Sequence, residues 1–292
     1  MWRVWPSIRH WRYEKIPKQP FEDRFIEVNG TTLHYVDWGA DERKPFVMLH
    51  GIHGHAREWD RLAEATRATH RPVAPEMRGH GDSARNASGE YSILKYVEDV
   101  GAFISELDLG PVSLMGHSLG GIIGIALAAM VPDAVERLII VDIGPDLGEE
   151  GMNSIRESAG SRPRVFADLD SAYQWALEGD SLADESEMRH RIQHGLKPGP
   201  DGLEWRYDPG VDTILDSADG DGSSMLWGLW SSIAQPTLII RGDQSDLLTS
   251  ESAQQMAAIG QNASLVEVPN SGHLVPVDNP EFFCETVRGF LS

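Results

Sequence analysis

The sequence predicts an α/β fold: a mostly parallel, eight-stranded sheet with helices on both faces and an inserted helical cap. Three observations predict it, namely short apolar runs of strand length, amphipathic segments of helical period between them, and one long polar interruption. Strands that alternate with helices favour parallel pairing, because each helical crossover returns the chain to the same edge of the sheet.

The expected elements start with a β-hairpin, in which residues 24–28 and 32–37 flank the turn-forming pair Asn29-Gly30. Apolar runs of strand length follow at residues 46–49, 72–75, 112–115, 138–143, 237–240 and 265–268. Segments of helical period are found at residues 58–68, 93–109, 119–131, 252–259 and 280–291. Together these elements account for eight strands and the helices that connect most of them.

The interruption lies between the strand that ends at residue 143 and the strand that starts at residue 237. A crossover needs only about a dozen residues, so this stretch is far longer than a connection requires. We therefore expect a cap subdomain at residues 146–234, between core segments 22–145 and 235–292. The cap is expected to be mostly helical, at residues 171–177, 185–194 and 224–233, with a loop over 197–222.

Charge and composition exclude several classes of protein. The 45 acidic and 25 basic residues give a net charge of −20, which repels phosphate backbones, so no nucleic-acid partner is expected. The one cysteine, Cys284, cannot form an intrachain disulfide and fits a small core residue, which favours a cytoplasmic location. No apolar run approaches the ~20 residues of a membrane span.

Residues 1–21 form a basic extension that differs from the acidic remainder. The first twenty residues hold five basic side chains against one acidic side chain, a net charge of +4, together with Trp2, Trp5 and Trp11. One interpretation is an interfacial segment at a lipid surface. We expect instead that the segment packs on the acidic body or on a second subunit, so a homo-oligomer is compatible with the sequence.

The strongest chemical signal is the sequence Gly116-His117-Ser118-Leu119-Gly120, which lies between an apolar strand and an apolar helix. A Gly-x-Ser-x-Gly pattern in this position predicts a sharp turn that exposes the serine hydroxyl above the sheet. Glycines remove the Cβ atoms that would collide in such a turn. Ser118 is therefore the candidate nucleophile.

A serine nucleophile needs a base and an acid that orients the base. His273 follows a predicted strand and is expected at the same sheet edge as Ser118. For the acid we favour Asp246 over Asp243, because a residue deeper in the loop reaches the histidine more easily. Asp142, at the end of another strand, is an alternative acid that we interpret as a turn residue.

An oxyanion hole needs two backbone donors. The N–H of Leu119 follows the nucleophile, and the N–H of Ile52 lies on a Gly-containing loop after a strand. The expected substrate pocket includes His50, Gly51 and His117 near this loop. Trp227 and Trp230 complete it from the cap, although cap-to-body packing alone would also explain these two indoles.

Three histidines in the same loop, His50, His53 and His55, raise the question of a metal site. The cluster lacks the carboxylate or cysteine spacing of common metal sites. Neither a metal nor another cofactor is therefore expected.

The order of these motifs resembles the α/β-hydrolase fold family in its capped, esterase-like branch. The resemblance covers about residues 24 to 291 and includes the family's order of serine, acid and histidine along the chain. It also includes the turn Arg78-Gly79-His80-Gly81-Asp82-Ser83, which is structural in the family. A serine at the nucleophile position does not fit the haloalkane dehalogenases or epoxide hydrolases, which use an aspartate.

These features predict a serine hydrolase that cleaves a small carboxylic ester or a related acyl compound through an acyl-enzyme. Alternatives on the same catalytic residues are hydrolysis of a C–C bond, a lactone or an amide. A different class is a small-molecule receptor with slow turnover. In every case the expected partner is a small molecule.

Overall fold

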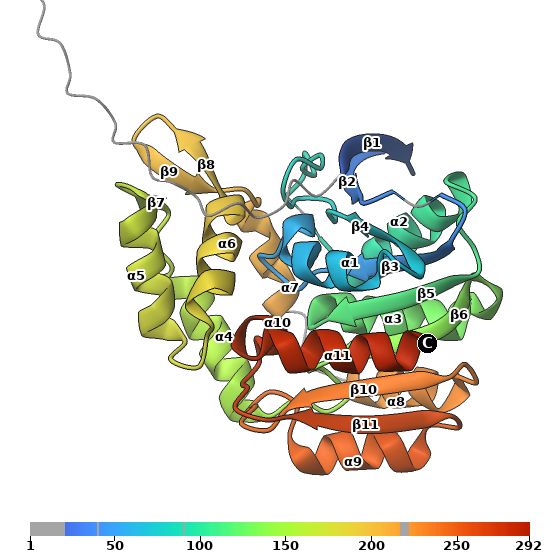
Figure 1. The fold of residues 1–292 in the computed structure, drawn as a ribbon. Coiled ribbons are helices and arrows are strands. Elements are labelled where there is room, and N and C mark those ends of the chain that lie inside the picture. Colours follow the sequence, from blue (N-terminus) through green and yellow to red (C-terminus); the bar gives the residue numbers. More distant parts are fainter. Residues whose placement is uncertain (1–20, 40, 90, 217–221) are drawn as a thin grey trace, which may run out of the picture.

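The computed structural model describes residues 21–292 except residues 40, 90 and 217–221. The predicted arm at residues 1–20 therefore lies outside the described residues. Within them, eight strands form one sheet in the order β1-β2-β4-β3-β5-β6-β10-β11 (Figure 1), which confirms the predicted α/β fold. The strands are β1 (Glu22–Val28), β2 (Thr31–Asp37), β3 (Lys44–Leu49), β4 (His70–Pro75), β5 (Val112–His117), β6 (Val135–Val141), β10 (Thr237–Gly242) and β11 (Ala263–Val268).

Pairing from β4 through β3, β5, β6 and β10 to β11 is parallel, whereas β2 pairs antiparallel with both β1 and β4. The β1–β2 hairpin turns at Asn29 and Gly30, whose φ angles are 49° and 72°. Both values suit the turn that matches the twist of a two-residue hairpin. Because six strands run the same way, their carboxyl ends share one edge, where loops can bring distant residues together.

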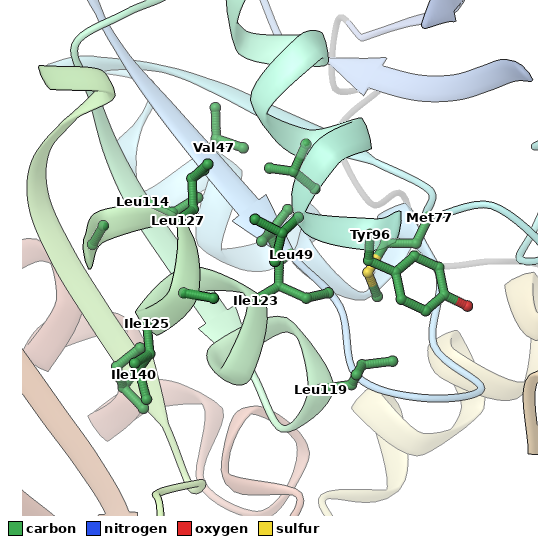
Figure 2. Packing of buried hydrophobic residues seen from close by; sticks show 14 of the residues in the cluster. Val47, Leu49, Met77, Tyr96, Leu114, Leu119, Ile123, Ile125, Leu127 and Ile140 are labelled. Atoms are coloured by element: carbon green, nitrogen blue, oxygen red, sulfur yellow. The ribbon is translucent and has the colours of Figure 1, made fainter. Parts of the chain in front are cut away.

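Helices cover both faces of the sheet. One face packs against α2 (Ile93–Glu106), α3 (Leu119–Met130) and α9 (Ser250–Ile259), and the other against α1 (Asp60–Thr66) and α11 (Pro280–Leu291). Figure 2 shows how Leu49 and Leu114 of the strands meet Ile123 and Leu127 of α3. Short helical turns complete the body at η1 (Ala56–Trp59), η2 (Pro132–Ala134) and α10 (Val275–Asp278). Cys284 of α11 is buried in this core.

The cap contains a small sheet that the sequence analysis did not predict. Its helices are α4 (Glu149–Ser161), α5 (Leu169–Gly179), α6 (Glu185–Gly195) and α7 (Thr213–Asp216), with a turn η3 (Pro209–Asp212). Strands β7 (Val165–Phe166), β9 (Gly202–Trp205) and β8 (Leu196–Gly199) pair antiparallel in that order. The described part of the expected loop, residues 197–216, is thus largely regular structure, and residues 217–221 lie outside the description. In Figure 1 α4, α5, α6 and the small sheet gather on one side of the main sheet.

Helix α8 (Gly222–Ser232) packs on the body and not among the other cap helices. It contacts α3, and Trp230 is 1% exposed with its indole N–H donating to the carbonyl of Met256 at 3.0 Å. Trp227 packs against the same core. Cap-to-body packing therefore accounts for both indoles. Among the described residues, no helix combines the length and apolar character needed to cross a membrane.

Candidate active site

Ser118 lies at the sharp turn between β5 and α3. Its φ and ψ are 53° and −121°, a conformation that costs a non-glycine residue about 1–3 kcal/mol. A Cβ on Gly116 would lie 2.1 Å from the Gly120 carbonyl oxygen, and a Cβ on Gly120 would lie 2.6 Å from the Leu49 carbonyl oxygen. Both glycines are therefore required for the turn, as the motif predicts. The turn places Ser118 at the edge where the parallel strands end.

His273 lies on the loop between β11 and α10 and faces Ser118. Its Nε2 is 3.1 Å from Ser118 Oγ, and its Nδ1 is 2.9 Å from Asp142 Oδ2. The His273 side chain is 20% exposed, whereas Asp142 is fully buried. Serine, histidine and aspartate thus form one continuous chain of contacts from the cavity into the protein interior.

The structure places Asp142, and not the expected Asp246, against His273. Asp142 directly follows β6, the strand between β5 and β10, so it leaves the sheet beside the strand that carries Ser118. Asp246 has an exposed side chain at the cavity wall. Asp243 accepts a hydrogen bond from the Ser271 backbone N–H at 3.1 Å and so supports the histidine loop.

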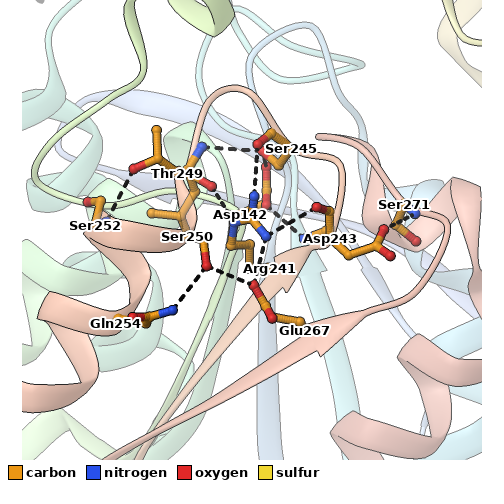
Figure 3. Close-up of polar contacts among 12 residues, drawn as sticks. Asp142, Arg241, Asp243, Ser245, Thr249, Ser250, Ser252, Gln254, Glu267 and Ser271 are labelled. Atoms are coloured by element: carbon orange, nitrogen blue, oxygen red, sulfur yellow. Dashed lines mark hydrogen bonds and ion pairs between the residues drawn. The ribbon is translucent and has the colours of Figure 1, made fainter.

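Several donors surround the buried Asp142 carboxylate. Oδ1 accepts from the Gly242 N–H at 3.0 Å, and Oδ2 accepts from the Ser245 hydroxyl at 2.6 Å. Figure 3 shows Asp142 and Ser245 beside Arg241, whose guanidinium donates to the Ser245 carbonyl at 3.0 Å. Together with His273 Nδ1, these donors contact both carboxylate oxygens of Asp142 and fix the direction of its side chain.

The loop after β3 passes directly beside the nucleophile. A Cβ on Gly51 would lie 3.0 Å from His117 Nδ1 and 3.2 Å from Ser118 Cβ, so only a small residue allows this approach. Ile52, the next residue, lines the same cavity as Ser118. Leu119 starts α3 immediately after the nucleophile. The two expected backbone donors therefore come from segments on either side of Ser118.

The three loop histidines each have a hydrogen-bond partner. His50 accepts from the Met77 N–H at 3.1 Å, His53 Nε2 bonds the Asp212 carboxylate, and His55 Nε2 lies 2.9 Å from the Arg191 carbonyl. Burial lowers the pKa of all three and brings that of His55 to about 4. Each imidazole is therefore bonded to a different part of the chain, which fits a structural role for all three histidines.

Groups of side chains that could hold a metal ion occur elsewhere in the described chain. Asp60, His190 and His194 form one, and His34, Glu76 and Asp82 form the other. In the first, Arg57 donates to both Asp60 carboxylate oxygens. In the second, the Asp82 N–H donates to Glu76 Oε2 at 2.7 Å, so the acidic oxygens of both groups already have protein donors.

A cavity of about 370 Å³ lies above Ser118, between the cap and the body. Of the expected pocket residues, Gly51 and His117 line it, together with Ile52, Ser118 and His273. His50 is fully buried and does not line it. Trp227 and Trp230 do not line it either, since α8 packs on α3. The cavity indoles are Trp175 of α5 and Trp205 of β9, which the sequence analysis did not select.

Comparison with known proteins agrees with this architecture. The family model described as the alpha/beta hydrolase family matches residues 46–286. A 3-hydroxybutyrate-oligomer hydrolase from Cupriavidus necator is 33% identical over 256 residues, which span 82% of this chain and 86% of that protein. The chain therefore belongs to the alpha/beta hydrolase family.

Two further similarities bear on the class of enzyme. An esterase from Mycobacterium tuberculosis is 28% identical over 274 residues, 91% of this chain and 88% of that protein. The crystal structure of an alpha/beta hydrolase from Novosphingobium aromaticivorans has a TM-score of 0.83 at 27% identity, covering 94% of this chain and 99% of that one. The protein is thus a hydrolase, and its relatives include esterases.

Proposed function

We propose that this hydrolase cleaves a small carboxylic ester with Ser118 as nucleophile, His273 as base and Asp142 as the orienting acid. The observation that carries the proposal is the unbroken contact chain from Ser118 Oγ through His273 to Asp142. His273 Nε2 takes the hydroxyl proton as Oγ attacks the carbonyl carbon, and then gives that proton to the departing alcohol. Water, activated by the same nitrogen, releases the acid from the acyl-enzyme.

The oxyanion would be held by the backbone N–H groups of Ile52 and Leu119. Both residues flank Ser118, and Gly51 brings the first segment close to it. Preorganised backbone donors lower the barrier because they require no reorganisation when the negative charge develops. In this proposal the loop after β3 stabilises the oxyanion of the transition state and also forms one side of the cavity.

An ester is favoured over other acyl substrates because the relatives include an esterase and a 3-hydroxybutyrate-oligomer hydrolase. Lactone, amide and C–C bond hydrolysis use the same residues and remain in the substrate panel. A slow-turnover receptor would show a single acylation event per molecule. Sustained release of product over many cycles separates the enzyme from such a receptor.

The test is a panel of short-chain and aryl esters, lactones and amides with the parent protein and Ser118→Ala. The substitution should lower hydrolysis by about 10⁴-fold or more, because no other group replaces the nucleophile. A serine-directed phosphonate should modify the parent once, at Ser118, and leave Ser118→Ala unmodified. Activity of Ser118→Ala within about tenfold of the parent would remove Ser118 from this role.

The pH dependence gives a second readout. Activity should be lost in acid, because only a neutral imidazole can accept the Ser118 proton. A rate that stays constant from neutral pH into acid would contradict a histidine base. Chelators should leave the rate unchanged, because no step in this mechanism uses a metal.

A further inference from the structure

Arg162 lies in the wall of the catalytic cavity and has an unusual environment. It follows α4 directly, and three aromatic rings surround its guanidinium. The guanidinium carbon lies 5.5 Å from the Trp175 ring centroid, 5.0 Å from that of Trp205 and 5.8 Å from that of Tyr207. These rings come from α5 and from β9 and the residues after it, so the cap holds this cation in one place above the nucleophile.

The donors of Arg162 are largely unused within the described chain. Its Nε is buried and has no hydrogen-bond partner among the described residues. One terminal nitrogen reaches the Tyr207 hydroxyl at 3.5 Å, which is long for a hydrogen bond. Aromatic faces attract the cation but offer no acceptor in the plane of the guanidinium. Burial lowers the pKa of Arg162, yet an arginine remains charged in proteins.

Nearby acidic groups are engaged elsewhere. The Asp212 carboxylate bonds His53, and Asp180 accepts from the Leu182 N–H at 3.1 Å. Asp246 lines the cavity but is exposed to solvent. The other cavity arginine, Arg191, forms an ion pair with Glu58 at 3.0 Å. Arg162 is therefore a cation in the cavity lining for which the described residues provide no carboxylate hydrogen-bond partner.

We propose that Arg162 binds a carboxylate on the substrate, so that the enzyme acts on acyl compounds that carry a free carboxylate besides the bond that is cleaved. This inference rests on the proposed function, because the reacting carbonyl must reach Ser118 in the same cavity. A planar guanidinium binds a carboxylate through two parallel hydrogen bonds, which gives orientation as well as affinity. The cavity volume of about 370 Å³ suits a small monoester of a dicarboxylic acid.

The test compares two substrates that differ by this charge and one methyl group: 4-nitrophenyl hydrogen glutarate and its methyl ester. Both release the same leaving group, so the ratio of their kcat/KM values reports recognition of the carboxylate. The parent should prefer the charged substrate. Arg162→Gln should lower kcat/KM for the charged substrate by about 10- to 100-fold. It should change kcat/KM for the methyl ester by less than about threefold.

Arg162→Lys and Arg164→Leu are the companion variants. Lysine keeps the charge without the paired donors and should retain part of the preference for the charged substrate. Arg164 is exposed and does not line the cavity, so Arg164→Leu should behave as the parent. Because the preference is a ratio within one preparation, partial misfolding of a variant does not alter it. If Arg162 had only a structural role, Arg162→Gln would lower kcat/KM equally for both substrates. That result would overturn the inference.

Binding of glutarate, measured by calorimetry with glutaramide as the neutral control, separates this inference from the proposed function. Glutarate should bind the parent and Ser118→Ala alike, and Arg162→Gln should lose that binding. Equal binding of glutarate and glutaramide, or unchanged glutarate binding in Arg162→Gln, would overturn the carboxylate site. If Ser118→Ala hydrolyses both esters as well as the parent does, the proposed function fails while the glutarate result still decides the role of Arg162.

Discussion

The body and the cap of this hydrolase meet at one cavity but are built on different principles. The body buries continuous apolar strands between two layers of helices, and its site residues leave the ends of β5, β6 and β11. A smaller apolar cluster that includes Tyr173 and Ile192 lies mostly in the cap and extends to Val277 of the body, and the cap otherwise relies on polar and aromatic contacts. In the proposed mechanism the reacting groups come from this sheet edge, whereas Arg162, the proposed carboxylate-binding residue, comes from the cap.

The largest expected effect concerns the acid in the body. Asp142→Asn should lower kcat by about 10³- to 10⁴-fold, because the amide cannot hold His273 in the required tautomer or stabilise its charged form. Asp246→Asn should stay within about threefold of the parent, because its side chain is exposed and both ring nitrogens of His273 are bonded to other residues. Steady-state kinetics on one ester would decide between them, and an inactive Asp246→Asn with an active Asp142→Asn would reverse the assignment.

The second effect concerns the packing of the nucleophile turn. Gly116→Ala places a Cβ 2.1 Å from the Gly120 carbonyl, where backbone must move. We expect a loss of about 3 kcal/mol in the free energy of unfolding, together with loss of activity, because the displaced backbone carries Ser118. Urea unfolding followed by tryptophan fluorescence measures it. Parent-like stability would mean that the turn tolerates a side chain and is less tightly packed than these contacts indicate.

The sequence predicted the body well because each of its elements carries its own signal. Strands β3, β5 and β6 are short apolar runs, and Ser118 could be recognised from the neighbouring Gly116 and Gly120. His273 could be placed because it follows a strand at the right edge. Asp142 was misread because the choice of acid depends on which strands are neighbours. The available signal was its position directly after β6, whereas Asp246 follows the end of β10 by several residues.

The cap was predicted less well for physical reasons. Helix α4 is mostly polar: Gly151 is its one fully buried residue, and Met152 and Ile155 are only partly buried, so its apolar face is short. Strand β8 reads Leu196-Lys197-Pro198-Gly199, a sequence more typical of a turn than of a strand. These segments gain their structure from contacts between them, such as the packing of Trp205 against Phe166. The environment of Arg162 exists only once those contacts have formed.

A smaller effect tests the boundary between the two regions. Burial and the neighbouring Asp180 carboxyl raise the pKa of Asp278 to about 8, while the Gly272 N–H donates to Asp278 Oδ2 at 2.8 Å. A raised carboxyl pKa means that the folded state holds a proton that the unfolded state releases above about pH 4. This contribution to stability is therefore present below about pH 4 and is lost as the pH rises toward 8.

Asp278→Asn should remove that pH dependence. Its amide oxygen can still accept from Gly272, and its N–H₂ can donate to Asp180. The slope of unfolding free energy against pH between 5 and 8 should become less negative by up to about 1.4 kcal/mol per pH unit, the value for one proton. Urea midpoints at several pH values measure it. An unchanged slope would show that Asp278 does not retain its proton in the folded state over this pH range.

The smallest effect concerns a glycine-to-alanine substitution in the cap. The same kind of substitution at Gly116 in the body is expected to be strongly destabilising. Gly160 lies in α4 with nothing within 4 Å of an added Cβ, so alanine meets no obstacle there. Alanine restricts the unfolded chain and favours the helix, so Gly160→Ala should raise the free energy of unfolding by about 0.5–1 kcal/mol.

The gain in stability should appear in the main unfolding transition if cap and body unfold together, and in an earlier transition if the cap unfolds first. Ester hydrolysis should be unchanged, because Gly160 does not line the cavity and the added methyl group meets no atom within 4 Å. A loss of stability on Gly160→Ala would show that the cap around α4 is as tightly constrained as the nucleophile turn, and the contrast between the two regions would fail.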